Sequence, residues 1–151
     1  MISVQPDDPS SPEASALIEA LSQTLASITG ETGKASFDVA DVQGPQGLFV
    51  VARDADGTAV GCGAFRPLQP GVAEIKRMYA RPGTKGVGHA ILAHLEREAI
   101  ARGYDEAWLE TGDVNTRAIA FYQAHGYRPI PTFGRYVGKP GAVCFARRLT
   151  S

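Results

Sequence analysis

A glycine-rich turn between a strand pattern and a helix pattern constrains the fold of this chain more than any other feature. The strand pattern, Val72–Ala80, leads through Pro82 into Gly83-Thr84-Lys85-Gly86-Val87-Gly88. Apolar residues at helical spacing follow, on one face of a predicted helix: Val87, Ile91, Leu92, Leu95 and Ala99. Because the N–H groups that begin a helix are unpaired, such a turn can bind a phosphate. A tight turn with no ligand is the alternative.

The remaining elements follow from the same two periodicities. Ser11, Pro12 and Glu13 predict a helix start, and Gly30 its end. A second amphipathic helix is expected over residues 115–125. Strands are expected at residues 2–5, 48–52, 58–65, 105–110, 127–130 and 142–149, with residues 31–46 irregular and a turn over residues 66–71. The sum is an α/β fold, in which an antiparallel meander precedes a β-α-β-α-β run and a closing strand.

Length and composition exclude several classes of protein. A chain of 151 residues is the size of one domain. Fifteen basic against sixteen acidic residues exclude a strongly basic nucleic-acid binder. The cysteines, Cys62 and Cys144, form no CxxC motif, so a disulfide scaffold is not expected. Neither a secretion signal nor a membrane-spanning apolar run is present, so a cytoplasmic location is expected.

Other chemical motifs fit the sequence poorly. The run from Gly86 to Ile91 lacks the third glycine of a dinucleotide fingerprint, and Ala35 follows Gly33-Lys34 where a phosphate-binding Walker loop needs Ser or Thr. The three histidines have no HExxH spacing, and no serine lies in a GxSxG motif. No metal site is therefore expected.

Two segments of the chain, together with the distance between them, resemble the GCN5-related N-acetyltransferases, the GNAT superfamily. Residues 73–99 are similar to the family's acetyl-CoA motif, and the run from Asn115 to Tyr127 is similar to its downstream motif. The resemblance implies one N-acetyltransferase domain over residues 1–151. It also implies a GNAT-like (acyl-CoA N-acyltransferase) fold, which is a mixed, mostly antiparallel sheet flanked by helices with a splayed central strand pair.

The resemblance also implies that acetyl-CoA is the acyl-donor cosubstrate. The residues expected to bind it by position are Met78, Tyr79, Ala80, Lys85, Gly86, Val87, Gly88, His89 and Asn115. Asn115 could equally cap the helix that follows it. Gly83 stands where the family usually has Arg or Gln, and the approach to the loop is shorter than usual. Contacts to the pyrophosphate are therefore expected from backbone N–H groups, which any residue but proline supplies.

The resemblance also implies two catalytic residues. Glu74 matches the position of a general base acting through water, and Tyr122 matches the general acid that protonates the leaving thiolate. The alternatives are a strand glutamate that faces solvent or pairs with Lys76, and a tyrosine that only packs on the sheet. A covalent acetyl-cysteine at Cys62 is a less favoured route.

The expected reaction is transfer of an acetyl group to a primary amine, with a small molecule as partner. The cations Arg66, Arg77, Arg135 and Lys139 lie near segments that often border the acceptor, which favours an acceptor bearing a carboxylate or phosphate. Members of the family often dimerise, so a homodimer stays open. The alternatives are a non-catalytic acyl-CoA-binding or regulatory module on the same fold, and an unrelated nucleotide-binding α/β domain.

Overall fold

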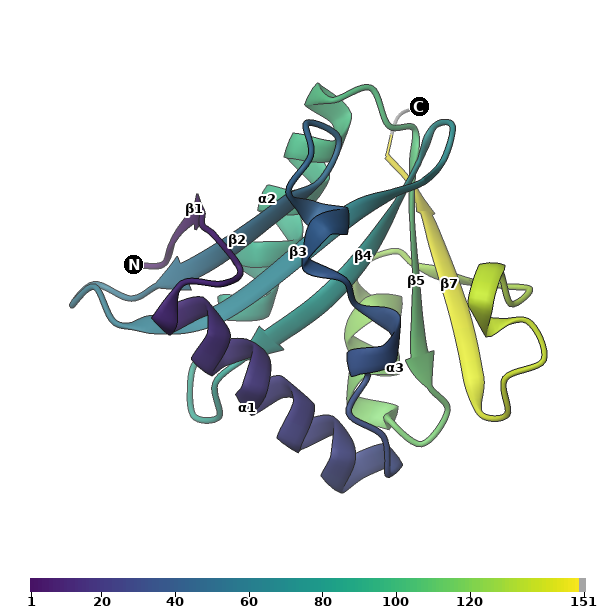
Figure 1. The fold of residues 1–151 in the computed structure, drawn as a ribbon, viewed down its shortest axis with the longest axis horizontal. Helices are drawn as coiled ribbons and strands as arrows, with labels where there is room; N and C mark the ends of the chain where they lie inside the picture. Colours follow the sequence, from purple (N-terminus) through teal and green to yellow (C-terminus); the bar gives the residue numbers. More distant parts are fainter. Residues whose placement is uncertain (150–151) are drawn as a thin grey trace.

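Seven strands form one mixed sheet in the computed structural model, which describes residues 1–149 (Figure 1). The sheet order is β1-β2-β3-β4-β5-β7-β6, and every neighbouring pair is antiparallel except β4 with β5. The strands are β1 (Ser3–Pro6), β2 (Leu48–Arg53), β3 (Ala59–Gln69), β4 (Val72–Ala80), β5 (Glu106–Gly112), β6 (Arg128–Ile130) and β7 (Ala142–Arg148). The predicted α/β class and the mostly antiparallel sheet are confirmed.

Three helices cover the two faces of the sheet: α1 (Pro12–Thr29) on one, and α2 (Val87–Ala101) and α3 (Thr116–Ala124) on the other (Figure 1). As predicted, α1 begins at a serine cap, where the N–H of Ala14 donates to Ser11 Oγ at 3.2 Å. It ends at Gly30, whose φ of 83° favours glycine. The start and the end of α1 therefore follow from local sequence chemistry.

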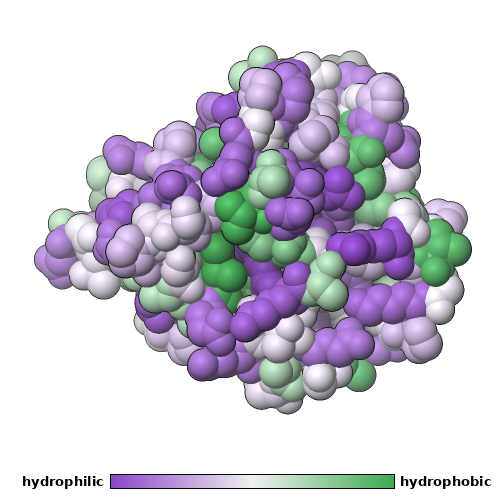
Figure 2. Space-filling model, in the orientation of Figure 1, coloured by the Kyte–Doolittle hydropathy of each residue, from purple (hydrophilic) through white to green (hydrophobic). Residues whose placement is uncertain are grey.

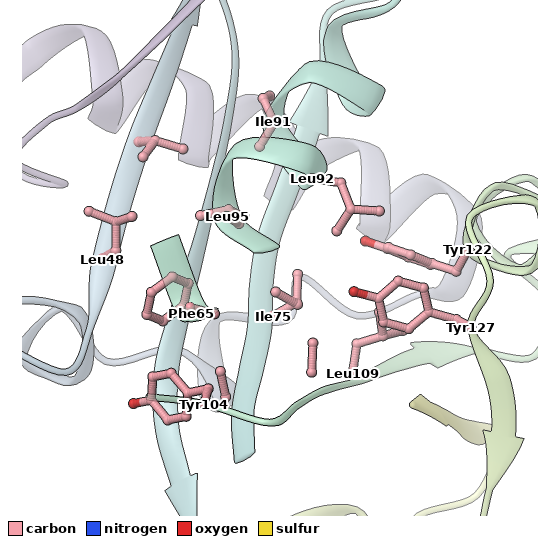
Figure 3. Close-up of a cluster of buried hydrophobic side chains, with 14 of the residues drawn as sticks. Leu48, Phe65, Ile75, Ile91, Leu92, Leu95, Tyr104, Leu109, Tyr122 and Tyr127 are labelled. Atoms are coloured by element: carbon pink, nitrogen blue, oxygen red, sulfur yellow. The ribbon is translucent and has the colours of Figure 1, made fainter. Parts of the chain in front are cut away.

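Strand β2 explains how one short apolar run serves both faces. Its side chains alternate, so Leu48 and Val50 pack in the α2 layer while Phe49 and Val51 pack in the α1 layer. The α2 layer holds the larger cluster of buried side chains. Figure 3 shows Ile91, Leu92 and Leu95 of α2 pointing onto the sheet. Gly61 and Gly63 of β3 let α2 pack closely on the sheet. A Cβ at Gly61 would lie 2.6 Å from Val87 Cγ1, and one at Gly63 would lie 2.6 Å from Ile91 Cγ2.

The parallel pair β4 and β5 separates after three residue pairs. Pairing runs from Val72 with Glu106 to Glu74 with Trp108 and then stops, and Figure 1 shows the two strands diverging toward their ends. On its other edge β4 contains a bulge, because the register slips between the pairs Cys62–Tyr79 and Ala64–Lys76. The bulge includes Arg77, whose φ of 55° is positive. The expected splayed central pair is confirmed.

Two local predictions differ from the structure. The turn expected over residues 66–71 is mostly strand, since β3 continues to Gln69. Pro67 is tolerated because β2 pairs with β3 only as far as Phe65, which leaves one edge of β3 without a ladder to break. Residues 31–46 contain two short 3₁₀ helices, η1 (Lys34–Ser36) and η2 (Val39–Val42). The closing strand β7 inserts between β5 and β6, an order that periodicity does not encode.

Candidate active site

A cleft of about 750 Å³ opens where β4 and β5 diverge. Its walls come from the second half of α1, the first turns of α2 and α3, and the loop that includes η3 (Gly134–Tyr136). Figure 2 shows hydrophobic and hydrophilic residues meeting in the middle of this face of the molecule. Most of the residues predicted for a site line this one cleft: Glu74, Met78, Tyr79, Ala80, Gly86, Val87, Gly88, His89, Asn115 and Tyr122. Lys85 is exposed and does not line it.

The N-terminus of α2 presents free backbone donors to the cleft. Gly86 adopts the left-handed conformation at the N-cap position, with φ of 75°, and no side chain caps the helix. The first helical bond runs from Ala90 N to Gly86 O at 3.0 Å, so the N–H groups of Val87, Gly88 and His89 precede the helical ladder. Unpaired N–H groups and the helix dipole favour an anion here.

The first turn of α2 packs directly on α3. A Cβ at Gly88 would lie 3.2 Å from two ring atoms of Phe121, which explains the glycine as a packing requirement. The rings of His89 and His125 join the same helices, with Nδ1 of His89 3.0 Å from Nε2 of His125. Since His125 Nδ1 bonds to the Phe121 carbonyl at 2.7 Å, it carries the proton, and a neutral pair needs His89 to donate. Periodicity gave no sign of this pair.

Asn115 caps α3 and also lines the cleft. Its Oδ1 accepts a hydrogen bond from the N–H of Ala118 at 3.2 Å. The capping role, one of the two expected alternatives, is therefore confirmed. Its position in the cleft leaves the amide NH2 group available to a ligand.

Tyr122 lies on α3 and is almost fully buried, with 8% of its surface exposed. Its ring packs edge-on against Phe121 and Tyr127. In Figure 3 the hydroxyls of Tyr122 and Tyr127 point to the same side. Burial raises the pKa of the Tyr122 hydroxyl, so it is protonated at neutral pH. No side-chain hydrogen bond to this hydroxyl occurs within residues 1–149.

Glu74 lies at the centre of a buried polar network. Its side chain is 1% exposed, and Arg66 Nε donates to Oε1 at 2.8 Å. Tyr136 OH donates to Oε2 at 2.7 Å, and Lys76 Nζ lies 3.4 Å from the same oxygen. Lys76 also donates to the Tyr136 hydroxyl at 3.1 Å. The alternative of a solvent-facing Glu74 is wrong, whereas its pairing with Lys76 is observed.

Sequence reasoning missed two polar residues in this part of the cleft. Tyr136 comes from a loop without periodicity, and burial together with Glu74 raises the pKa of its hydroxyl. Glu110, on β5, is a second carboxyl group in the cleft, and burial raises its pKa. Lys139 Nζ lies 3.7 Å from Glu110 and partly opposes that shift. Glu110 directly follows the apolar run of β5, a position that could have drawn notice.

The buried thiol of Cys62 has the wrong chemistry for a nucleophile. It donates to the carbonyl of Arg77 at 3.3 Å, and burial raises its pKa to about 12. A thiol rather than a thiolate is therefore present at neutral pH. Within residues 1–149 no cluster of His, Cys, Asp or Glu is arranged to hold a metal ion. Across the same residues, no helix is both long and apolar enough to cross a membrane.

Comparison with known proteins gives a consistent result. The sequence model of the Acetyltransferase (GNAT) family matches residues 15–127. An "IAA acetyltransferase" of Azospirillum brasilense is 33% identical over 136 residues, which is 88% of each chain. An uncharacterised N-acetyltransferase of Bacillus subtilis, YsnE, is 33% identical over 112 residues, covering 72% of this chain and 74% of that protein.

Solved structures share the fold over nearly the whole chain. A Klebsiella pneumoniae protein named a "putative acyl-CoA N-acyltransferase" superposes with a TM-score of 0.85 and 30% identity, covering 99% of this chain and 98% of the other. The PaiA N-acetyltransferase of Thermoplasma acidophilum, solved in complex with coenzyme A, has a TM-score of 0.74 and 18% identity, covering 98% and 99%. The chain therefore belongs to the GNAT family and is an acetyl-CoA-dependent N-acetyltransferase.

Proposed function

We propose that this enzyme acetylates the primary amine of a small molecule by direct attack on acetyl-CoA, with Glu74 as base through water and Tyr122 as acid. The observation that carries the proposal is that Glu74, Tyr122 and the uncapped start of α2 share one cleft. Residues 1–151 would act as one acetyltransferase domain in the cytoplasm. A homodimer, expected from the resemblance, stays a prediction that the mass of the protein in solution tests.

The cleft offers groups that suit two parts of acetyl-CoA, the pyrophosphate and the pantetheine arm. The N–H groups of Val87, Gly88 and His89 suit the pyrophosphate, because they are free and lie at the positive end of the α2 dipole. The edge of β4 beyond Glu74 has no strand partner on the β5 side, which suits the amide groups of the pantetheine arm. Tyr79 and Ala80 lie on this stretch. A backbone N–H at Met78 would polarise the thioester carbonyl as an oxyanion donor.

Glu74 is positioned to act as the base. An amine with a pKa of about 10 is mostly protonated at neutral pH and must lose a proton before it attacks. Hydrogen bonds from Arg66, Lys76 and Tyr136 fix the position of the Glu74 carboxyl group in the cleft. The side chain is too buried to touch a bulky substrate, which favours proton transfer through a water molecule.

Tyr122 is suited to the role of the acid that protonates the leaving thiolate. Attack forms the bond between nitrogen and the acyl carbon and breaks the bond between carbon and sulfur, so a thiolate leaves. A thiol with a pKa of about 8.5 gives a thiolate that is a weaker base than a phenolate. Departure of the sulfur is still easier when a general acid gives it a proton as the bond to carbon breaks. The Tyr122 hydroxyl is protonated, buried and free of competing acceptors in the described chain. It can therefore supply that proton in the transition state.

The test is thiol release from acetyl-CoA across a panel of small amines, with wild type and Glu74→Gln. Glutamine keeps the shape and retains one of the two acceptor oxygens, but it cannot take a proton. We expect wild type to release CoA in step with amine acetylation and Glu74→Gln to lose about 10²-fold in kcat, the usual contribution of a general base. Binding of acetyl-CoA by both proteins without turnover on any amine would instead favour the non-catalytic module.

A further inference from the structure

The bulge in β4 directs two consecutive cationic side chains to the same side of the sheet. Lys76 reaches Tyr136 in the cleft. Arg77, the next residue, lies over the ring of Phe37 at 5.5 Å and bonds to the carbonyl of Thr32, so it also points toward the α1 side. A regular strand would send these two side chains to opposite faces. The positive φ of Arg77 marks the backbone distortion that brings them together.

Arg77 is a buried cation without an anionic partner. It is 7% exposed, its two terminal nitrogens share the Thr32 carbonyl at 3.4 Å each, and its Nε has no hydrogen-bond partner. No carboxylate of residues 1–149 comes within ion-pair distance of it. Burial lowers its pKa, which reflects the cost of holding the charge there. A guanidinium in such a place normally has a carboxylate or phosphate beside it.

The surrounding charges add to this excess. Lys76 shares its ion-pair partner, Glu74, with Arg66. Burial lowers the pKa of Lys76, and the nearby charges of Arg66 and Arg135 lower it further. The other carboxylates near this part of the cleft, Glu31 and Glu110, both lie beside Lys139. Glu19, whose charge also acts on Arg77, forms an ion pair with Lys34 at 3.1 Å. This part of the cleft therefore has more cations than carboxylates, and Arg77 has no carboxylate within ion-pair distance.

We propose that Arg77 and Lys76 bind a carboxylate of the acceptor, which makes the acceptor an amino acid or a closely similar small molecule. This inference rests on the proposed acetylation of a small amine. Arg77 directly precedes Met78, whose backbone N–H is the proposed donor to the thioester carbonyl, and both residues line the same cleft. An acceptor that carries its carboxylate close to its amine suits this arrangement. Leu25, Ile28 and Phe37 line the same cleft and provide an apolar surface for the side chain of the acceptor.

Matched pairs of amines that differ only in the carboxylate test the proposal. Phenylalanine with phenethylamine, leucine with isoamylamine, and methionine with 3-(methylthio)propylamine form the panel, at saturating acetyl-CoA. We expect kcat/KM to favour the amino acid of at least one pair by about 100-fold, the usual effect of a buried charge pair. In Arg77→Met this ratio should fall toward one, while Arg77→Lys should keep part of it.

A structural role alone would lower activity on both members of a pair and leave their ratio unchanged. The thermal stability and acetyl-CoA affinity of each variant separate a folding defect from lost recognition. If no amine is acetylated, calorimetry of the same pairs with the CoA complex still tests carboxylate recognition. The amino acid of a pair should then bind more tightly than its decarboxylated amine. Turnover or binding of only the decarboxylated amines, or a ratio unaltered in Arg77→Met, would overturn the proposal without touching the acetyltransferase assignment.

Discussion

The hydroxyl of Tyr136 donates a hydrogen bond of 2.7 Å to Oε2 of Glu74, although the two residues are 62 positions apart in the chain. The bond ties the loop after β6 to the strand that carries the proposed base. Lys76 completes the triangle through the same hydroxyl. The position of Glu74 in the cleft therefore depends on a loop that the sequence marks only by its glycines and prolines.

Tyr136→Phe should lower kcat for acetyl transfer while leaving acetyl-CoA affinity near the wild-type value. Removing the hydroxyl takes away one donor to Glu74 and one acceptor for Lys76, at a cost of about 1–3 kcal/mol in the free energy of unfolding. Tyr104→Phe is the matched control, since the Tyr104 hydroxyl donates to the Gln46 carbonyl at 2.7 Å outside the cleft. Equal losses of kcat in both variants would assign Tyr136 a purely structural role.

Glu110→Gln should change the pH dependence of stability. Burial raises the pKa of Glu110 in the folded state, so this group stabilises the fold fully below its unfolded pKa. That contribution is lost as pH rises through the folded pKa. The unfolding temperature of the variant relative to wild type should therefore increase from pH 4 to pH 8 in thermal melts. A difference that stays constant with pH would mean that Lys139 fully offsets the burial.

Gly86→Ala should weaken both the fold and cofactor binding. Gly86 adopts a φ of 75° with open space around its Cα, so an added methyl group meets strain in the backbone and not a clash. The expected cost is about 1 kcal/mol in the free energy of unfolding, with a higher Kd for acetyl-CoA in calorimetry. Gly44→Ala is the control, because Gly44 has neither a positive φ nor a close neighbour. Unchanged affinity in Gly86→Ala would argue against pyrophosphate binding at this turn.

The sequence predicted the elements of the fold well, and their arrangement less well. The cap at Ser11, the stop at Gly30 and the apolar face of α2 are local signals, and they matched the structure. Insertion of β7 between β5 and β6 depends on long-range pairing, so periodicity could not reveal it. Pro67 suggested a turn, yet it lies in β3, because a proline is harmless where a strand has lost its neighbour.

The candidate site, too, was predictable where local sequence motifs define it and not where long-range packing does. Residues within the two family motifs, such as Gly86, Asn115 and Tyr122, were found from sequence and line one cleft. Tyr136 was not found, since its contact with Glu74 arises only from the packing of a loop. The lack of an anion beside Arg77 was equally invisible, because sequence shows the charge and not its neighbours.

The kcat of Tyr122→Phe at saturating acetyl-CoA tests the central claim most directly. The hydroxyl has no hydrogen-bond partner in the described chain, so its loss should leave the fold and the acetyl-CoA Kd nearly unchanged. Tyr104→Phe is the control, since that hydroxyl bonds to the Gln46 carbonyl at 2.7 Å outside the cleft. We predict that kcat falls about 10²-fold in Tyr122→Phe alone, as expected for a lost general acid. A Tyr122→Phe enzyme with wild-type kcat would contradict the proposed mechanism.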